Sequence, residues 1–380
     1  MCIEHIVMKQ PPSRYIMVGG FLGAGKTTAI LKLAEHLRRQ ERTVGLITND
    51  QGAGLVDTAM ARACDFPVEE ISGGCFCCRF NSLAEATRKL TATTCPDVFI
   101  AEPVGSCTDL MATVALPMKH LYGDNYRIAP LSVLVDPIRA MRVLGIGDGR
   151  PFAPKVTYIY LKQLEEANLL VVNKCDLLDA AHTARLCEAL KTRFPRAEVF
   201  VVSARRGDGL AAWFDRCLSD ELSATDIMDM DYITYGVGEA MLGWLNATAR
   251  LAGPTVDGNE LLLRIGCALR DRLAKADVEV AHLKMTLTAV GDGLDIAVAN
   301  LVRTDATPEL SFRLEGPFTE GELTVNLRAQ AEPSLLERIV RDVLGEFGAS
   351  LGTLASFKPG QPNPTHRMDA TGVEHRPSLP

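Results

Sequence analysis

Short apolar segments recur along the first 220 residues, and stretches with helical periodicity separate most of them. The apolar segments, rich in β-branched residues, lie at 14–20, 43–49, 97–103, 131–137, 168–174 and 198–204. The helical stretches lie at 26–40, 82–92 and 183–194. Near-continuous apolar strands that alternate with helices are typical of a parallel sheet buried on both faces. This pattern predicts an α/β fold with a mostly parallel sheet flanked by helices.

The pattern changes beyond residue 240. HLKMTLTAV (282–290) and ELTVNLRAQ (322–330) alternate apolar and polar residues strictly, as half-exposed antiparallel strands do. Helical stretches accompany them at 259–276 and 334–346. We therefore expect a smaller α+β domain over 241–355, with one antiparallel sheet and its helices on one face.

Two segments follow neither pattern. Residues 221–240 begin with an acidic run, and we expect them to form a linker after a first domain at 1–220. Residues 356–380 are rich in proline and polar side chains, a composition that predicts a disordered tail.

The net charge of −7 is uneven, since residues 1–220 carry 26 basic and 24 acidic side chains and residues 221–380 carry 14 and 23. Neither part has the basic excess of a nucleic-acid binder, so we expect no nucleic-acid partner. The acidic C-terminal part suits a basic or metal-loaded partner. No apolar run reaches the roughly 18 residues of a membrane helix, and the N-terminus lacks a signal-peptide pattern. We expect a cytoplasmic protein without a membrane partner.

A glycine-rich segment, GGFLGAGKTT at 19–28, has the Walker A spacing and lies between an expected strand and an expected helix. Its backbone N–H groups can surround a phosphate, and the helix N-terminus adds partial positive charge. We expect Lys26 to bind the β- and γ-phosphates and Thr27 to ligate Mg²⁺. The predicted phosphate-binding residues are Gly20, Gly23, Ala24, Gly25, Lys26, Thr27 and Thr28.

The base is indicated by Asn173-Lys174-x-Asp176 at the end of an apolar segment. An aspartate there accepts hydrogen bonds from N1–H and the exocyclic amine of guanine, a donor pair that adenine lacks. Ser203 and Ala204 follow the next expected strand, where backbone groups can reach the guanine carbonyl. These residues predict that the chain binds GTP and GDP.

Three cysteines, Cys75, Cys77 and Cys78, follow a Gly-Gly pair in ISGGCFCCRF. Their thiolates can bind one tetrahedral Zn²⁺ or another soft divalent ion and leave one position open, as suits a protein that passes metal on. A redox pair and plain buried thiols are the alternatives. The sequence does not identify a fourth ligand. His120 is one candidate, but a structural role is favoured for this histidine.

Five pieces in order, GGFLGAGKTT, TND followed by Asp57, GGCFCC, EPVG (102–105) and NKCD, resemble the motifs of the CobW-type metallochaperone GTPases, whose relatives include UreG and HypB. The resemblance covers residues 14–220. It implies that the cysteine cluster binds the transferred metal, Zn²⁺ or Co²⁺, and that Glu102 acts as the Walker B carboxylate. Ala53 replaces a glutamate usual in the family, a His-rich tract is absent, and the C-terminal domain is atypical.

The implied function is GTP hydrolysis coupled to metal transfer to a client metalloprotein. Thr27, Glu102 and Asp50 are the expected Mg²⁺ ligands, and Lys26, Glu102 and Asp57 the expected catalytic residues. A nucleotide-dependent homodimer is common in the family. Assistance to a corrinoid (cobalamin) protein, a GTP-gated thiol redox switch and a GTP-driven dimerisation module remain alternatives. A P-loop small-molecule kinase leaves the guanine motif unexplained.

Overall fold

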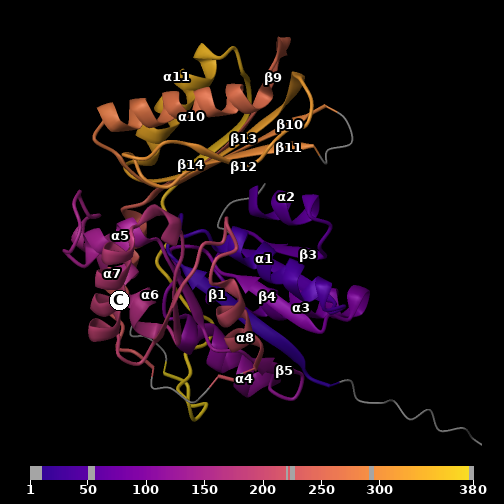
Figure 1. The fold of residues 1–380 in the computed structure, drawn as a ribbon, viewed down its shortest axis with the longest axis vertical. Helices are drawn as coiled ribbons and strands as arrows, with labels where there is room; N and C mark the ends of the chain where they lie inside the picture. The colour runs from indigo at the N-terminus through magenta and orange to yellow at the C-terminus, as the bar shows by residue number, and fades with distance from the viewer. Residues whose placement is uncertain (1–10, 50–55, 220, 223–226, 291–294, 376–380) are drawn as a thin grey trace, which may run out of the picture.

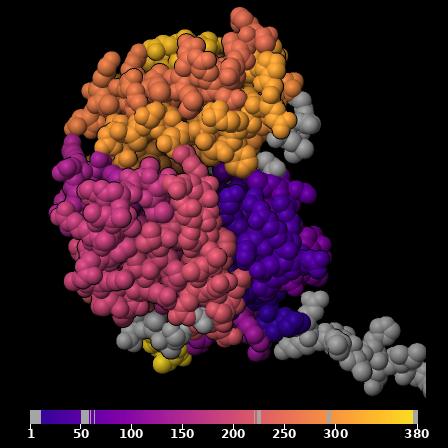
Figure 2. Space-filling model, viewed as in Figure 1, coloured from indigo at the N-terminus to yellow at the C-terminus, as the bar shows by residue number. Residues whose placement is uncertain are grey.

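A computed structural model describes residues 11–49, 56–219, 221–222, 227–290 and 295–375. The described residues form an N-terminal domain and a C-terminal domain stacked along the long axis of the molecule (Figure 1). Figure 2 shows the C-terminal domain, in orange, meeting both the indigo and the magenta parts of the N-terminal domain along a continuous seam. No helix within the described ranges is long and apolar enough to span a membrane.

The N-terminal domain is built on a parallel sheet with the strand order β3-β2-β4-β1-β6-β7-β8, and a short β5 pairs with β1. The strands are β1 (Ser13–Gly20), β2 (Val44–Asn49), β3 (Val68–Ile71), β4 (Val98–Glu102), β5 (Tyr126–Ile128), β6 (Ser132–Val135), β7 (Leu169–Val172) and β8 (Glu198–Val201). Both faces of β1 are buried, since Tyr15 and Met17 join one apolar core and Ile16 and Val18 the other. The predicted α/β fold is confirmed.

Helices cover both faces of this sheet (Figure 1). They are α1 (Lys26–Arg39), α2 (Val56–Ala63), α3 (Phe80–Thr94), α4 (Leu116–Tyr122), α5 (Pro137–Val143), α6 (Pro154–Glu166), α7 (Ala180–Arg193) and α8 (Leu210–Ser219), with a π-helical turn at Met111–Ala115 and a 3-10 turn at Cys175–Leu177. The cores formed by α1 and α8 on one side and by α3 and α6 on the other explain why the central strands carry almost no polar residues.

The C-terminal domain is one antiparallel sheet of order β12-β11-β10-β13-β9-β14, with two helices on one face. Its strands are β9 (Gly243–Val256), β10 (Glu279–Ala289), β11 (Ile296–Leu301), β12 (Glu309–Phe312), β13 (Phe318–Gln330) and β14 (Ser350–Phe357), and its helices are α10 (Gly258–Lys275) and α11 (Pro333–Glu346). The sheet lies between its helices and the N-terminal domain (Figure 1).

Residues 221–240 do more than link the two domains. Their second half forms α9 (Tyr232–Ala240), capped by Asp231 and packed against α6. Tyr232 and Tyr235 are buried in the core of the N-terminal domain, and Glu239 is buried there as well. The structure therefore assigns this half of the expected linker to the packed body of the N-terminal domain.

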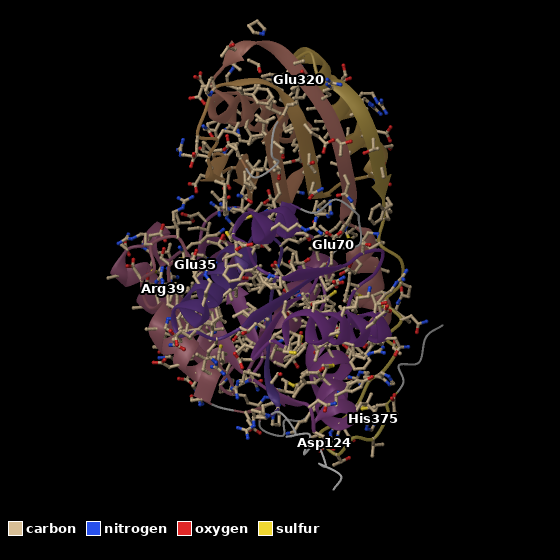
Figure 3. The ribbon with its side chains drawn as sticks, turned by 90° about the vertical axis from the view of Figure 1, so that its right-hand side faces the viewer. Glu35, Arg39, Glu70, Asp124, Glu320 and His375 are labelled. Carbon is tan, nitrogen blue, oxygen red and sulfur yellow. The ribbon has the colours of Figure 1, made fainter. Side chains whose placement is uncertain are left out.

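The predicted disorder of the tail is wrong for residues 356–375. Residues 358–375, which we name the strap, run back from β14 along the N-terminal domain to its far end. Figure 3 shows His375 there, at the other end of the molecule from Glu320 of the C-terminal domain. The strap has almost no secondary structure of its own, as its proline content predicts. Its backbone instead bonds to the N-terminal domain, as in the bond from Met368 N to Ala112 O of 2.8 Å.

Candidate nucleotide site and thiol cluster

The Walker A segment joins β1 to α1 as expected. Gly25 caps α1 with a left-handed φ of 90°, and a Cβ atom there would lie 2.5 Å from Asn173 Nδ2. Only glycine suits both conditions. Gly20 lies beneath the segment, where a Cβ atom would meet Leu134 O at 2.4 Å, so it shapes the turn and does not line the cavity.

The phosphate end of the site brings three predicted residues together. The Thr27 hydroxyl donates a hydrogen bond of 3.2 Å to Glu102 Oε1, and Lys26 Nζ lies 4.0 Å from the same oxygen. All three side chains are buried. A hydroxyl and a carboxylate are hard oxygen ligands of the kind that Mg²⁺ prefers, so Thr27 and Glu102 fit the expected ion.

The base end is organised by Asn173. Its Nδ2 donates to Ala24 O and its Oδ1 accepts from Ala204 N, both at 2.9 Å, so one side chain ties the Walker A segment to the loop after β8. Lys174 Nζ donates to Gly23 O at 2.7 Å. Asp176 Oδ1 is buried and has no hydrogen-bond partner among the described residues.

These groups line one cavity of about 700 Å³ at the carboxyl edge of the sheet. The predicted residues in its lining are Gly23, Gly25, Lys26, Thr27, Thr28, Glu102, Asn173, Lys174, Asp176, Ser203 and Ala204. Asp50 lies outside the described residues. Asp57 belongs to α2, and its side chain is likewise outside the description.

The other wall of the cavity comes from the C-terminal sheet, which the sequence did not reveal. Its lining residues include His282 and Lys284 of β10 and Asn326 and Arg328 of β13. They occupy the polar positions of the alternating strands. The alternation itself was the available signal, but it indicates only that one face is polar and not what that face covers.

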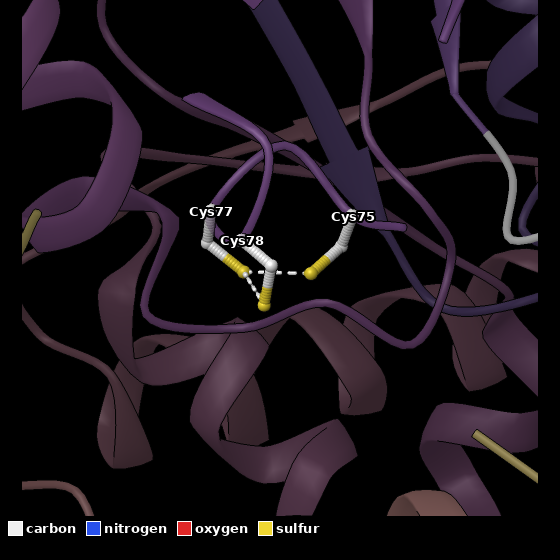
Figure 4. A group of neighbouring side chains, drawn as sticks. All are labelled: Cys75, Cys77 and Cys78. Atoms are coloured by element: carbon white, nitrogen blue, oxygen red, sulfur yellow. Dashed lines mark hydrogen bonds between the residues drawn. The ribbon is translucent and has the colours of Figure 1, made fainter. Parts of the chain in front are cut away.

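The three predicted cysteines form a compact cluster on the loop between β3 and α3, with their sulfur atoms directed toward one another (Figure 4). Their Sγ atoms all lie within 4.8 Å of one another. Cys75 Sγ is 2.8 Å from Cys77 Sγ, which is 3.8 Å from Cys78 Sγ. Cys75 and Cys77 are buried and Cys78 is half-buried.

A hydrogen-bond clamp from β2 holds this loop. Asn49 Nδ2 donates to Ile71 O at 2.9 Å and to Gly74 O at 2.7 Å, and its Oδ1 accepts from Phe76 N at 2.9 Å. Asn49 also lines the nucleotide cavity. One buried side chain thus touches both the cavity and the thiol loop.

A fourth cysteine lies beside the cluster. The buried Cys107 thiol is near enough to Cys75 and Cys77 to affect the pKa values of both, but it is outside the group of three whose Sγ atoms all lie within 4.8 Å of one another. Hydrogen bonds from Cys107, and then from Cys77 and Cys78, lower the pKa of the Cys75 thiol well below its usual range. The sequence offered one signal for Cys107, its position shortly after Glu102 at the end of β4, the sheet edge where the other thiols lie.

His120 does not lie with the thiols. It belongs to α4, and its ring faces Gly372 of the strap, where a Cβ atom would lie 3.0 Å from His120 Nδ1. The structure thus favours the structural role for this histidine.

The strap covers the thiol loop. Asn363 N donates to Cys78 Sγ at 3.2 Å, and Thr365 N donates to Cys77 O at 2.8 Å. Arg367 Nε then forms an ion pair of 2.7 Å with Asp109, whose side chain is only 1% exposed. The segment expected to be disordered therefore closes the outer side of the cluster.

Residues 14–201 match the family model described as CobW/HypB/UreG, nucleotide-binding domain. The zinc chaperone CobW of Sinorhizobium sp is 26% identical in an alignment of 225 positions that covers 52% of this chain and 60% of that protein. The zinc chaperone CobW of Pseudomonas aeruginosa is 25% identical in an alignment of 214 positions that covers 50% of this chain and 56% of that protein. The chain thus spans less than two thirds of the length of these relatives.

Among solved structures, the hydrogenase maturation factor HypB from Archaeoglobus fulgidus aligns with 53% of this chain and 87% of its own, at 20% identity and a TM-score of 0.39. The family match falls on the domain that carries both the nucleotide cavity and the thiol cluster, and residues 14–201 therefore form a nucleotide-binding domain of the CobW/HypB/UreG family.

Proposed function

We propose that this protein is a GTP-hydrolysing metallochaperone whose nucleotide state controls the binding and transfer of a thiolate-bound divalent metal to a client protein. The observation that carries the proposal is the cluster of Cys75, Cys77 and Cys78. It lies on a loop that is hydrogen-bonded to Asn49, a residue that lines the nucleotide cavity. Zinc is the proposed cargo, because the curated relatives are named zinc chaperones.

The sulfur geometry suits zinc after a small adjustment. Two thiolates on a tetrahedral zinc with bonds of about 2.3 Å lie about 3.8 Å apart. The separation of Cys77 and Cys78, 3.8 Å, matches this value, and Cys75 must move about 1 Å from Cys77 to reach it. Cys107 is the proposed fourth ligand, since its buried thiol lies near Cys75 and Cys77, although its Sγ must approach the other three more closely to share one ion with them.

Two connections link the thiols to the nucleotide cavity. Asn49 is one, because any shift of its side chain alters three hydrogen bonds of the thiol loop. The segment from Glu102 to Cys107 is the other. Gly105 within it packs against Leu22 of the Walker A segment, where a Cβ atom would lie 3.0 Å from Leu22 N, and Gln163 holds the carbonyls of Gly105 and Cys107 at 3.0 and 2.8 Å.

The proposed hydrolysis uses residues with distinct tasks. Lys26 stabilises the negative charge of the β- and γ-phosphates. Thr27 and Glu102 would hold Mg²⁺, which neutralises charge that develops on the phosphates. Asp57 at the start of α2 remains the candidate for orienting the attacking water. Asp50 remains the third candidate Mg²⁺ ligand.

Elemental analysis of the anaerobically purified protein, with and without GTP and Mg²⁺, tests the proposal. We expect about one zinc per chain, lost in a triple serine variant of Cys75, Cys77 and Cys78. A triple serine variant at three cysteines outside the cluster should keep its zinc. Those control positions are Cys64, Cys95 and Cys187.

A GTP-gated thiol switch is the second candidate, because Cys75 Sγ and Cys77 Sγ lie only 2.8 Å apart. The same purified protein distinguishes the two functions. Absence of stoichiometric metal, together with a reversible disulfide between cluster cysteines in mass spectra, would favour the switch and reject the metallochaperone.

A further inference from the structure

The polar face of the C-terminal sheet forms the roof of the nucleotide cavity. Along β10, Leu283 and Met285 join the core beneath α10 and α11, whereas His282 and Lys284 line the cavity. A period of two residues thus places a basic face of the C-terminal domain over the Walker A segment of the other domain.

Lys284 reaches the phosphate end of the cavity. Its Nζ donates a hydrogen bond of 3.2 Å to the hydroxyl oxygen of Thr27, which in turn donates to Glu102. Lys284 donates to a lone pair of Thr27 Oγ1, and a Mg²⁺ ion bound to Thr27 would need a lone pair of the same oxygen. Two cations on one oxygen repel each other, so Mg²⁺ at Thr27 moves the ammonium group away. The flexible four-carbon stem of lysine permits this movement, and a phosphate group bound by the Walker A segment would attract the ammonium group.

Other contacts hold the roof in place. Arg139, which is buried, donates to the carbonyls of Val280 and Ala281 at 3.4 Å each. A Cβ atom on Gly23 would lie 2.9 Å from Val302 Cβ, so the Walker A segment and the loop after β11 are in direct contact. Because these contacts do not involve Lys284, its substitution should leave the C-terminal domain docked.

We propose that Lys284 binds the terminal phosphate of GTP, so that the C-terminal domain contributes a cation to the nucleotide site of its own chain. GDP has no γ-phosphate, and Lys284 therefore makes binding selective for GTP. A cation delivered by a separate element to the transferred phosphate is the device that arginine fingers use. The proposal rests on the proposed GTP binding and specifies the C-terminal domain's part in it.

Isothermal titration with a non-hydrolysable GTP analogue and with GDP, both with Mg²⁺, tests this role in the full-length protein. In Lys284→Met, affinity for the analogue should fall about tenfold or more, the value of a hydrogen bond to a charged group, and affinity for GDP less than threefold. Lys284→Arg should recover most of the loss. Lys275→Met, at the exposed end of α10 behind the sheet, removes the same charge and should bind both nucleotides as wild type does.

The outcomes separate the two proposals. Failure of the wild-type protein to bind either nucleotide would reject the proposed function. Wild-type binding combined with an unchanged Lys284→Met variant would overturn the role of Lys284 alone. An equal loss for GDP and the analogue would also overturn it, because the lysine would then serve the β-phosphate. Thermal unfolding of each variant checks that the fold is intact.

Discussion

Arg367→Met tests whether the strap is an integral part of the N-terminal domain. Arg367 Nε pairs with Asp109 at 2.7 Å, and its Nη2 donates to Met228 O at 2.8 Å. The same Asp109 oxygen accepts from the Tyr232 hydroxyl at 2.6 Å. Substitution leaves a buried carboxylate with the neutral Tyr232 donor and without its paired guanidinium.

The expected loss of stability follows from this burial. Removing one partner of a buried ion pair costs roughly 3–5 kcal/mol. Because Tyr232 still donates to Asp109, we expect the lower end, about 3 kcal/mol, and a fall in melting temperature of roughly 6–12 °C. Burial raises the pKa of the Asp109 carboxyl, and the loss of Arg367 raises it further. Protonation at low pH relieves the buried charge, so the loss should be smaller at pH 5 than at pH 8.

Thermal unfolding at the two pH values measures the loss, and alkylation mapped by mass spectrometry reports the strap. Cys78 should react faster in the variant, because Asn363 N–H no longer covers its sulfur, while the exposed Cys95 should react equally in both proteins. Arg341→Met is the matched control. Its exposed pair with Glu337 of 2.8 Å should contribute at most about 0.5 kcal/mol. A loss in Arg367→Met no larger than in this control, with unchanged Cys78 reactivity, would refute the reasoning.

Three further predictions concern the thiol cluster and the buried acids. Cys107→Ser should weaken zinc binding at least about tenfold, since even the loss of an outer-sphere partner typically has this effect, whereas Cys95→Ser should leave zinc binding unchanged. Equal zinc affinities of Cys107→Ser and the wild-type protein in a chelator competition would exclude Cys107 from the site. Asn49→Ala should retain zinc but lose its response to nucleotide, and a preserved response in the same competition would assign the coupling to another element. Burial raises the pKa of Glu166 from 4.5 to about 8, so the folded protein binds a proton that the unfolded chain has released, and stability should fall between those pH values by about 1.4 kcal/mol per pH unit. Burial raises the pKa of Glu239 to about 8 as well, so Glu166→Gln should remove only the share of the slope that Glu166 contributes, and an unchanged slope in denaturant titrations would contradict the assignment.

Local patterns sufficed for the N-terminal sheet. Each long strand is an apolar run buried on both faces, and the Walker A and guanine motifs lie at strand ends, so their meeting at one edge follows from parallel topology. The short β3, whose residues VEEI carry two glutamates, gave no such signal. In the C-terminal domain the sequence analysis missed β9. Its sequence, GWLNATARLAGPTV, contains glycine, proline and several polar residues, which do not predict a strand, and it is held in the sheet by pairing with β13 and β14 on its two sides.

The missed site residues share one cause, which is contact between segments far apart in the sequence. Lys284 and Thr27 are separated by 257 positions, and no local pattern indicates their contact. The strap shows the same limit. Its composition correctly predicts that it forms no regular element, but its order comes from partners such as Asp109, 258 positions from Arg367.

The central claim is that nucleotide state sets the affinity of the thiol cluster for metal. Competition with a chromophoric zinc chelator, under argon and with Mg²⁺, gives the zinc dissociation constant of the wild-type protein with GDP and with a non-hydrolysable GTP analogue. The account predicts that the two constants differ fivefold or more, the usual lower range of allosteric coupling, and that serine at Cys75, Cys77 and Cys78 abolishes binding in both states. Equal zinc constants with the two nucleotides would contradict it.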